Sequence, residues 1–121
     1  MKRRETGMLG ERLASEFLEK NGYQILDTNY RCPDGEIDII AWHEDTLVFI
    51  EVRTKNDSRF GVPEESITPV KKERLKKVAA HYCQNHDNLL SSYRIDVVAI
   101  QMNNHGRISR IEIIENAIEE T

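Results

Sequence analysis

Two acidic residues interrupt apolar, strand-forming runs in this chain, and their spacing suggests metal chemistry. Asp38 stands in one run and Glu51 in the next, and the polar stretch 43–46 between them is typical of a hairpin turn. If the two middle residues of that stretch form the loop, Asp38 lies directly opposite Glu51. Facing residues have Cβ atoms about 4.5–5.5 Å apart, and like charges so placed destabilise a sheet. The pair therefore predicts a shared proton or a bound divalent cation.

The chemistry that this pair would support is hydrolysis of a phosphodiester. A carboxylate inside an apolar strand is costly unless it is neutralised, and hard cations such as Mg²⁺ and Mn²⁺ prefer oxygen ligands. Such an ion polarises a phosphoryl oxygen, activates water and stabilises the leaving oxygen. The structural alternative is that Asp38 and Glu51 are neutralised by a helix N-terminus or by an arginine.

Cationic residues accompany the acidic pair on the same side of the expected hairpin. Side chains alternate along a strand, so Glu36 and Asp38 share a face with Glu51, Arg53 and Lys55. The same register puts Glu36 opposite Arg53, where the two would form a cross-strand salt bridge. Arg53 and Lys55 are therefore either structural or contacts for phosphate and water.

The composition is that of one globular domain. The chain has 121 residues, of which 39% are hydrophobic and 31% charged, so a single domain over 1–121 is expected. Its core would span about 7–101, and 107–121 would add a terminal strand and an acidic tail. No apolar run approaches the roughly 18 residues of a membrane helix, so we expect no membrane contact.

The start of the chain and its cysteines indicate the cellular compartment, and its histidines indicate whether zinc is bound. The first residues lack the apolar segment of a secretory signal. Cys32 and Cys83 lie far apart in the sequence and are expected to be reduced thiols of a cytoplasmic protein. The four histidines have no ligand spacing, so zinc is not expected.

Basic residues gather in the middle of the chain although its net charge is −4. They outnumber the acidic residues between Arg53 and Lys77, and a local basic face can bind a phosphate backbone. The alternative is a solvated helix surface. The nucleic-acid contacts that we expect come from the second helix: Lys71, Lys72, Arg74 and Lys76.

Periodicity and turn signals predict an α/β protein with the order α-β-β-β-α-β-β, a mixed sheet flanked by helices. Thr68 and Pro69 are typical of the N-cap and first residue of a helix. The last strand would follow the turn at 103–106. The expected helices are 8–21 and 69–84, and the expected strands are 23–30, 36–42, 47–55, 93–101 and 107–114.

Several short motifs follow one another in a fixed order over residues 7–100. They are Gly7-x-x-Gly10-Glu11-x-x-Ala14, Gly22-Tyr23-x-Ile25-Leu26, Asn29-Tyr30-Arg31, Gly35-Glu36-Ile37-Asp38-Ile39-Ile40-Ala41, Val48-Phe49-Ile50-Glu51-Val52, Phe60-Gly61-x-Pro63, Thr68-Pro69-x-Lys71 and Arg94-Ile95-Asp96-Val97-Val98. In this set the chain resembles the uncharacterised bacterial YraN-like family. Members of that family look like endonucleases of the restriction-endonuclease-like PD-(D/E)xK fold, including the archaeal Holliday-junction resolvase type.

The resemblance implies a set of roles. Asp38 and Glu51 would be the metal-binding acids, holding Mg²⁺ or Mn²⁺, and Glu11 on the first helix would complete the site. Helical projection puts Glu11 and Glu16 at opposite rims of the apolar face, so geometry alone does not choose between them. The implied substrate is DNA, including branched DNA, and resolvase-like enzymes work as homodimers.

One departure from the family pattern concerns the catalytic lysine. The usual E-V-K-x-R appears here as Glu51-Val52-Arg53-Thr54-Lys55, with lysine and arginine exchanged. Arginine stays protonated in proteins and cannot act as a base. Two lysines could compensate, Lys55 on the same strand and Lys71 at the head of the second helix. We expect Lys71 to extend to solvent rather than to approach the site.

Three interpretations remain open from the sequence. The first is a divalent-metal-dependent endonuclease, with Arg53, Lys55 or Lys71 contacting phosphate or water. The second is a DNA-binding module of the same fold that has lost the chemistry, which Arg53 favours. The third is a protein-interaction domain in which Glu36, Asp38, Glu51 and Arg53 form a closed ionic cluster.

Overall fold

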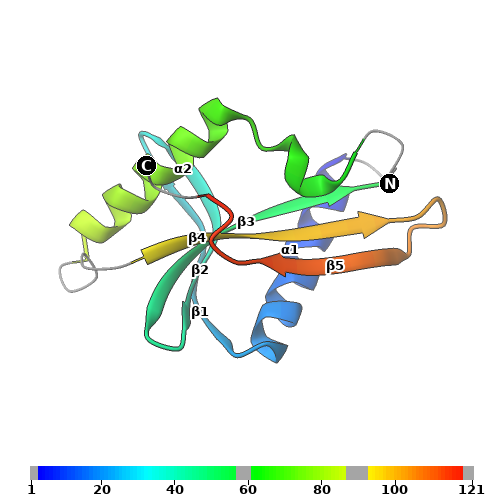
Figure 1. The fold of residues 1–121 in the computed structure, drawn as a ribbon, viewed down its shortest axis with the longest axis horizontal. Helices are drawn as coiled ribbons and strands as arrows, with labels where there is room; N and C mark the ends of the chain where they lie inside the picture. The colour runs from blue at the N-terminus through cyan, green and yellow to red at the C-terminus, as the bar shows by residue number, and fades with distance from the viewer. Residues whose placement is uncertain (1–2, 57–60, 87–92, 119–121) are drawn as a thin grey trace.

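The computed structural model describes residues 3–56, 61–86 and 93–118, with side chains described from residue 8 onward. It is an α/β structure with five strands and two α-helices in the order α-β-β-β-α-β-β (Figure 1), which confirms the predicted layout. The elements are α1 (Arg3–Lys20), β1 (Tyr23–Cys32), β2 (Gly35–His43), β3 (Thr46–Lys55), the 3₁₀ turn η2 (Pro63–Ser66), α2 (Pro69–Gln84), β4 (Tyr93–Met102) and β5 (Ile108–Ile114).

The five strands form one twisted, mixed sheet in the order β1-β2-β3-β4-β5 (Figure 1). Neighbouring strands are antiparallel except β3 and β4, which are parallel. A parallel pair needs a long crossover, and here α2 supplies it. Helix α1 covers one face of the sheet and α2 the other, so β3 is central and enclosed on both sides.

The hairpin between β2 and β3 has the predicted register. His43 pairs with Thr46 across the two-residue loop, and the ladder continues to Ile39 and Ile50. Glu44, the first loop residue, has a positive φ of 56°, as short hairpin loops often require. The turn that the sequence predicts is confirmed, and it fixes which residues of the two strands meet.

Two hydrophobic clusters, one under each helix, account for the composition of β3. Leu47 and Phe49 enter the cluster beneath α2, whereas Val48 and Ile50 enter the cluster beneath α1. A strand that is apolar on both faces belongs at the centre of a covered sheet. Glu51 follows directly in this buried strand, so its carboxyl group is carried into the interior.

Helix α1 lies very close to β3 at a single glycine. A Cβ atom added to Gly10 would lie 2.4 Å from Oγ1 of Thr54, a distance at which atoms overlap. The missing side chain therefore lets the helix backbone approach the strand, and it sets the height of the next residue, Glu11, above the sheet.

No helix in the described ranges is long and apolar enough to cross a membrane.

Helix α2 begins as the sequence predicts. The Oγ1 of Thr68 accepts a hydrogen bond from the Lys71 amide at 3.2 Å, and Pro69 occupies the first turn. The helix presents a stripe of buried residues to the sheet, Leu75, Val78 and Tyr82. Lys71 heads this stripe at the N-terminal end of the helix.

Candidate metal centre

The strands β2 and β3 separate just beyond the last pair of their ladder, Ile39 and Ile50. In the next row the Oδ2 of Asp38 accepts a hydrogen bond from the Val52 amide at 2.8 Å. The aspartate side chain thus takes the place of a backbone carbonyl, and the two strands open around it. We call this opening, with Asp38 and Glu51 on its two sides, the fork.

Asp38 and Glu51 meet in the fork, although not as the ordinary ladder pair that the sequence predicts. The register is right as far as Ile39 and Ile50, but Asp38 bonds to the backbone of β3 instead of facing Glu51 across the ladder. Its carboxyl group still reaches that of Glu51, which is only 4% exposed. Burial, with the contact to Asp38 added, raises the pKa of Glu51 to about 8.

Two cations flank the Glu51 carboxylate without neutralising it fully. Lys71 Nζ lies 3.4 Å and Arg53 Nη2 3.6 Å from Oε2 of Glu51, which is longer than a typical charged hydrogen bond. The expectation that Lys71 extends to solvent is wrong, since its ammonium group turns toward Glu51. The head of α2 thus supplies a lysine to the fork.

The predicted salt bridge between Glu36 and Arg53 is replaced by two others. Glu36 pairs with Arg31 of β1 at 3.3 Å, and Arg53 pairs with Glu51 along its own strand. The Nε of Arg53 is buried without a hydrogen-bond partner. The ion pairs found here do not form the closed cluster of Glu36, Asp38, Glu51 and Arg53 that one interpretation required.

Glu11 reaches the fork from the opposite side, from α1. Glu11 and Asp38 line one cavity of about 220 Å³, together with Asn29 of β1. Burial, then the neighbouring charge of Asp38, raises the pKa of Glu11. Glu16 is exposed. Helical projection did not distinguish the two glutamates, but the tertiary structure places only Glu11 beside Asp38.

The fork therefore contains oxygen donors suited to a hard cation. No three His, Cys, Asp or Glu side chains in the described part of the chain are arranged to hold a metal ion by themselves. Mg²⁺, however, usually binds through one or two carboxylates and keeps several waters. Asp38 and Glu51 provide two such carboxylates. A bound cation would compensate for the cost of burying the negative charge of Glu51.

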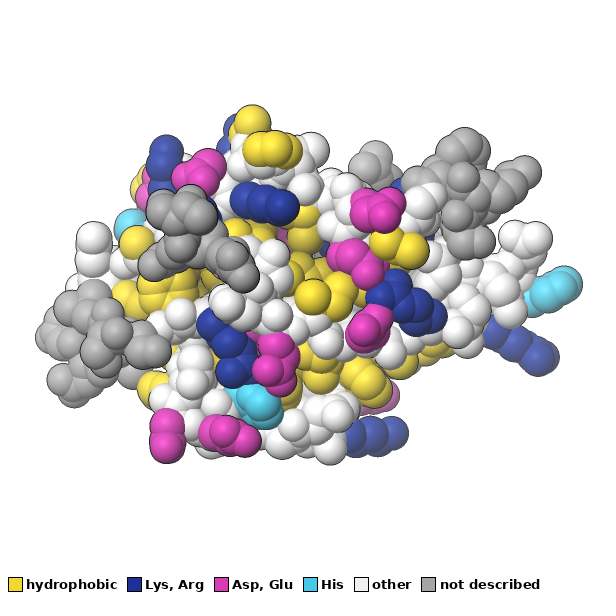
Figure 2. Space-filling model, in the orientation of Figure 1, with side chains coloured by type: hydrophobic (Ala, Val, Ile, Leu, Met, Phe, Trp, Pro, Cys, Tyr) yellow, Lys and Arg dark blue, Asp and Glu magenta, His cyan; other side chains and the backbone are white. Residues whose placement is uncertain are grey.

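The remaining basic candidates lie farther from the acids. Lys55 is four residues beyond Glu51 on β3, roughly 13 Å along the strand. Lys72 and Arg74 are exposed on α2, and Lys76 pairs with Glu73 at 3.3 Å. On the face in Figure 2 the basic side chains are interspersed with acidic ones rather than gathered in one patch.

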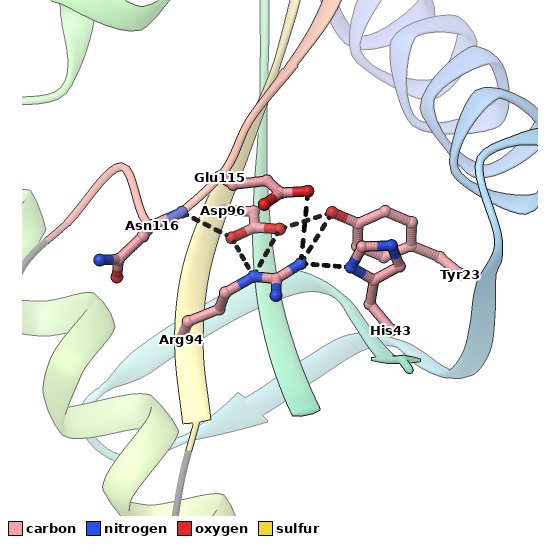
Figure 3. Close-up of polar contacts among 6 residues, drawn as sticks. All are labelled: Tyr23, His43, Arg94, Asp96, Glu115 and Asn116. Atoms are coloured by element: carbon pink, nitrogen blue, oxygen red, sulfur yellow. Dashed lines mark hydrogen bonds and ion pairs between the residues drawn. The ribbon is translucent and has the colours of Figure 1, made fainter. Parts of the chain in front are cut away.

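A second buried acid, Asp96, anchors a polar network (Figure 3). Arg94, two residues earlier on the same strand, donates from Nε at 2.9 Å. The Tyr23 hydroxyl and the Asn116 amide also donate, at 2.8 and 2.9 Å, and His43 joins through Arg94. No local pattern identifies Tyr23 or His43, because 73 residues separate Tyr23 from Asp96.

The fold and the fork define an α/β protein with an acidic site between two central strands. Comparison with known proteins adds that the chain belongs to the uncharacterised protein family UPF0102, whose model matches residues 10–100. This confirms the resemblance to the YraN-like family drawn from the motifs.

Relatives in this family match along nearly their whole length. The UPF0102 protein of Caldicellulosiruptor saccharolyticus is 45% identical over 117 residues, which cover 97% of this chain and 99% of that protein. That of Moorella thermoacetica is 44% identical over 117 residues, covering 97% and 98%. That of Dehalococcoides mccartyi is 46% identical over 118 residues, covering 98% and 96%.

Proposed function

We propose that this protein is a divalent-metal-dependent, endonuclease-like protein that hydrolyses phosphodiester bonds in DNA. The observation that carries the proposal is the fork, where Asp38 and Glu51 meet between two strands beside a lysine. Two carboxyl groups in contact, one of them buried, oppose folding when both are charged, so the pair needs a proton or a cation to neutralise it. Mg²⁺ or Mn²⁺ is the cation that their oxygen atoms suit.

Asp38 and Glu51 would hold the ion, which on binding would supply Lewis-acid chemistry to a phosphoryl oxygen and to water. The Val52 amide fixes Asp38 through its Oδ2 atom, so the carboxylate is oriented before any ligand arrives. Glu11 lines the cavity beside Asp38. The protein's own contribution is thus a preorganised pair of acids, of which Glu51 is almost fully shielded from water.

Lys71 would take the role that the exchanged strand lysine cannot fill. Its Nζ lies 3.4 Å from Glu51 Oε2, and an ammonium group has three donors that can be directed at water or at a phosphate oxygen. Lys71 would orient the attacking water or give up a proton to the leaving oxygen. Arg53 stays charged and would instead hold Glu51 or a phosphate in place.

The exposed basic residues of α2 would contact the DNA backbone near the fork. Lys72 and Arg74 follow Lys71 directly in the helix and are exposed. Each phosphate contact releases bound counterions, so affinity would fall steeply as salt is raised. Because the whole chain is acidic, with a net charge of −4, binding would depend on this helix rather than on overall charge.

The test is cleavage of linear, nicked and four-way DNA with Mg²⁺ or Mn²⁺. We expect the wild type to cut at least one substrate, Asp38→Asn and Lys71→Met to be inactive, and Asp45→Asn to match the wild type. Asp45 is a suitable control because it is exposed in the hairpin loop. Equal cleavage by wild type and Asp38→Asn would exclude this mechanism.

A second function is favoured by one specific observation, the arginine in the position of the strand lysine. Arg53 is already engaged with Glu51, and this contact suits a DNA-binding module without turnover. Restoring the lysine with Arg53→Lys separates the two functions. Cleavage that appears only in Arg53→Lys, with DNA binding in both proteins, would establish the module; cleavage by the wild type would exclude it.

A further inference from the structure

A second cavity, of about 310 Å³, lies at the opposite end of β2 from the fork. Asp38 and His43 are five residues apart on this strand, roughly 16 Å along it. Three segments far apart in the sequence meet at the cavity: the end of α1 with the start of β1, the end of β2, and the end of β5. The cavity is lined by Phe17, Asn21, Tyr23, His43, Ile111, Glu112, Ile113 and Glu115.

The floor of this cavity is fixed by the buried carboxylate of Asp96 (Figure 3). Asp96 is fully buried and accepts hydrogen bonds from Tyr23 and from Arg94 Nε. The Nη2 of Arg94 lies 2.6 Å from Nδ1 of His43. A guanidinium group has only donors, so Nδ1 of His43 is the acceptor.

The walls of the cavity are aromatic and aliphatic. The His43 ring stacks on that of Tyr23, with centroids 4.1 Å apart and planes 4° apart, as Figure 3 shows. Phe17 of α1 faces them from the helix, and Ile111 and Ile113 of β5 are only partly buried. Tyr23 is only 4% exposed and the Arg94 guanidinium lies 5.9 Å from its ring centroid, so the rings that remain partly exposed in the cavity are those of His43 and Phe17.

The rim of the cavity is acidic. Glu112 and Glu115 have side chains 52% and 58% exposed, and Glu112 pairs with Arg110, which does not line the cavity. Glu115 Oε1 lies 3.9 Å from Arg94 Nη2, beyond hydrogen-bond reach. Its carboxylate therefore retains its capacity to accept hydrogen bonds from another cation.

We propose that this cavity binds an alkylguanidinium or alkylammonium group. The cation would pair with Glu115 at the rim and lie against the face of the Phe17 ring, where cations are attracted. Its alkyl stem would pack on Phe17, Ile111 and Ile113, as the stems of Arg and Lys do on apolar surfaces. A phosphate is disfavoured because both rim side chains are carboxylates. The group is carried either by an Arg or Lys side chain of a partner protein or by a free polyamine.

This site is independent of the proposed nuclease activity, because it shares no residue with the fork. Its volume is at the lower end of the range for small-molecule sites, which suits a single side chain. The ligand would find the floor already in place, so little ordering of the protein would be needed on binding.

The experiment is a titration of the full chain, followed by NMR signals of His43 and of the Ile111 and Ile113 methyl groups. The probes are ethylguanidinium, an acetylated arginine amide, spermidine and methyl phosphate. We expect saturable shifts with the three cations and none with methyl phosphate. A tighter fit for the arginine amide would indicate a protein partner, and a tighter fit for spermidine a polyamine.

Glu115→Gln is the variant that tests the proposal. Its side chain is more than half exposed, so we expect it to fold, and it should weaken cation binding about tenfold. Glu73→Gln, an exposed glutamate on α2, should bind like the wild type. Absence of saturable shifts, or equal weakening by the two variants, would overturn the proposal by showing only general attraction to an acidic protein.

Discussion

Two carboxylates are buried on adjacent central strands, and their surroundings differ sharply. Asp96 accepts hydrogen bonds from Arg94, Tyr23 and a backbone amide within 3.2 Å. Glu51 lies against a second carboxyl group, with its two cations 3.4 and 3.6 Å away. Removing a partner from a buried, paired charge is strongly destabilising, and a buried charge that is left partly unpaired already costs stability. The comparison separates a structural acid from a functional candidate.

Figure 3 shows how the contacts of Asp96 link distant segments of the chain. The network ties the start of β1, the end of β2, β4 and the turn after β5 to one carboxylate. In the fork, by contrast, the two acids lie outside the β2–β3 ladder, and a cavity lies beside Asp38. Both acids are buried, so the donors around each one, rather than burial, distinguish them.

The largest effect is expected from Asp96→Ala. Removing the carboxylate leaves Arg94, whose side chain is 19% exposed, without its main partner in the interior. Breaking a buried ion pair in this way costs about 3–5 kcal/mol. Urea unfolding at neutral pH measures the loss. A change below about 1 kcal/mol, the scale of a surface pair, would mean that Asp96 is not the anchor that its contacts indicate.

The next effect concerns the pH dependence that Glu51 gives to stability. Its pKa of about 8 in the folded protein lies above its ordinary value, so between the two the folded state keeps a proton that the unfolded state has lost. Stability from this group is therefore full at low pH and is lost as pH rises through about 8.

Unfolding in chelator from pH 5 to pH 9, compared with Glu51→Gln, isolates this contribution from other titrating groups. We expect the stability of the wild type to decline relative to Glu51→Gln as pH rises, while Glu73→Gln follows the wild type. If the stability of wild type and Glu51→Gln depended on pH in the same way, the proton that the folded state retains would belong to another group.

A smaller effect is expected from Gly10→Ala. The added methyl group would overlap Thr54 Oγ1, which lies 2.4 Å from the Cβ position, and overpacking of this kind costs about 1–3 kcal/mol. It would also lift Glu11 away from Asp38. Adding Thr54→Ala removes the overlapping oxygen, so the double variant should recover most of the lost stability in thermal unfolding. No recovery would mean that the glycine serves another purpose.

The smallest effect is expected from Glu51→Gln at pH 6. The carboxyl group is then mostly protonated, so the amide differs little from it, and Lys71 and Arg53 are about one-third exposed and can turn to water. We expect the free energy of unfolding to stay within about 1 kcal/mol of the wild type. A loss as large as that of Asp96→Ala would make the two acids equivalent and remove the distinction.

Local pattern determined most of the fold. The alternation and turn chemistry of 36–55 predict the hairpin and its register, and Thr68 with Pro69 predicts where α2 begins. These features depend on neighbours in the sequence, which is why they can be read without coordinates. The candidate acids Asp38 and Glu51 stand out for the same reason, as charges in apolar strands.

Tertiary structure alone decided how the acids are used. It turned Lys71 toward Glu51, chose Glu11 over Glu16, and drew Tyr23 and His43 to the Asp96 network from distant segments. It also moved Asp38 from a ladder pair to a hydrogen bond with the backbone of β3. Side-chain direction and long-range packing set these contacts, because only the assembled layers fix the distances between helices and sheet on which charge interactions depend.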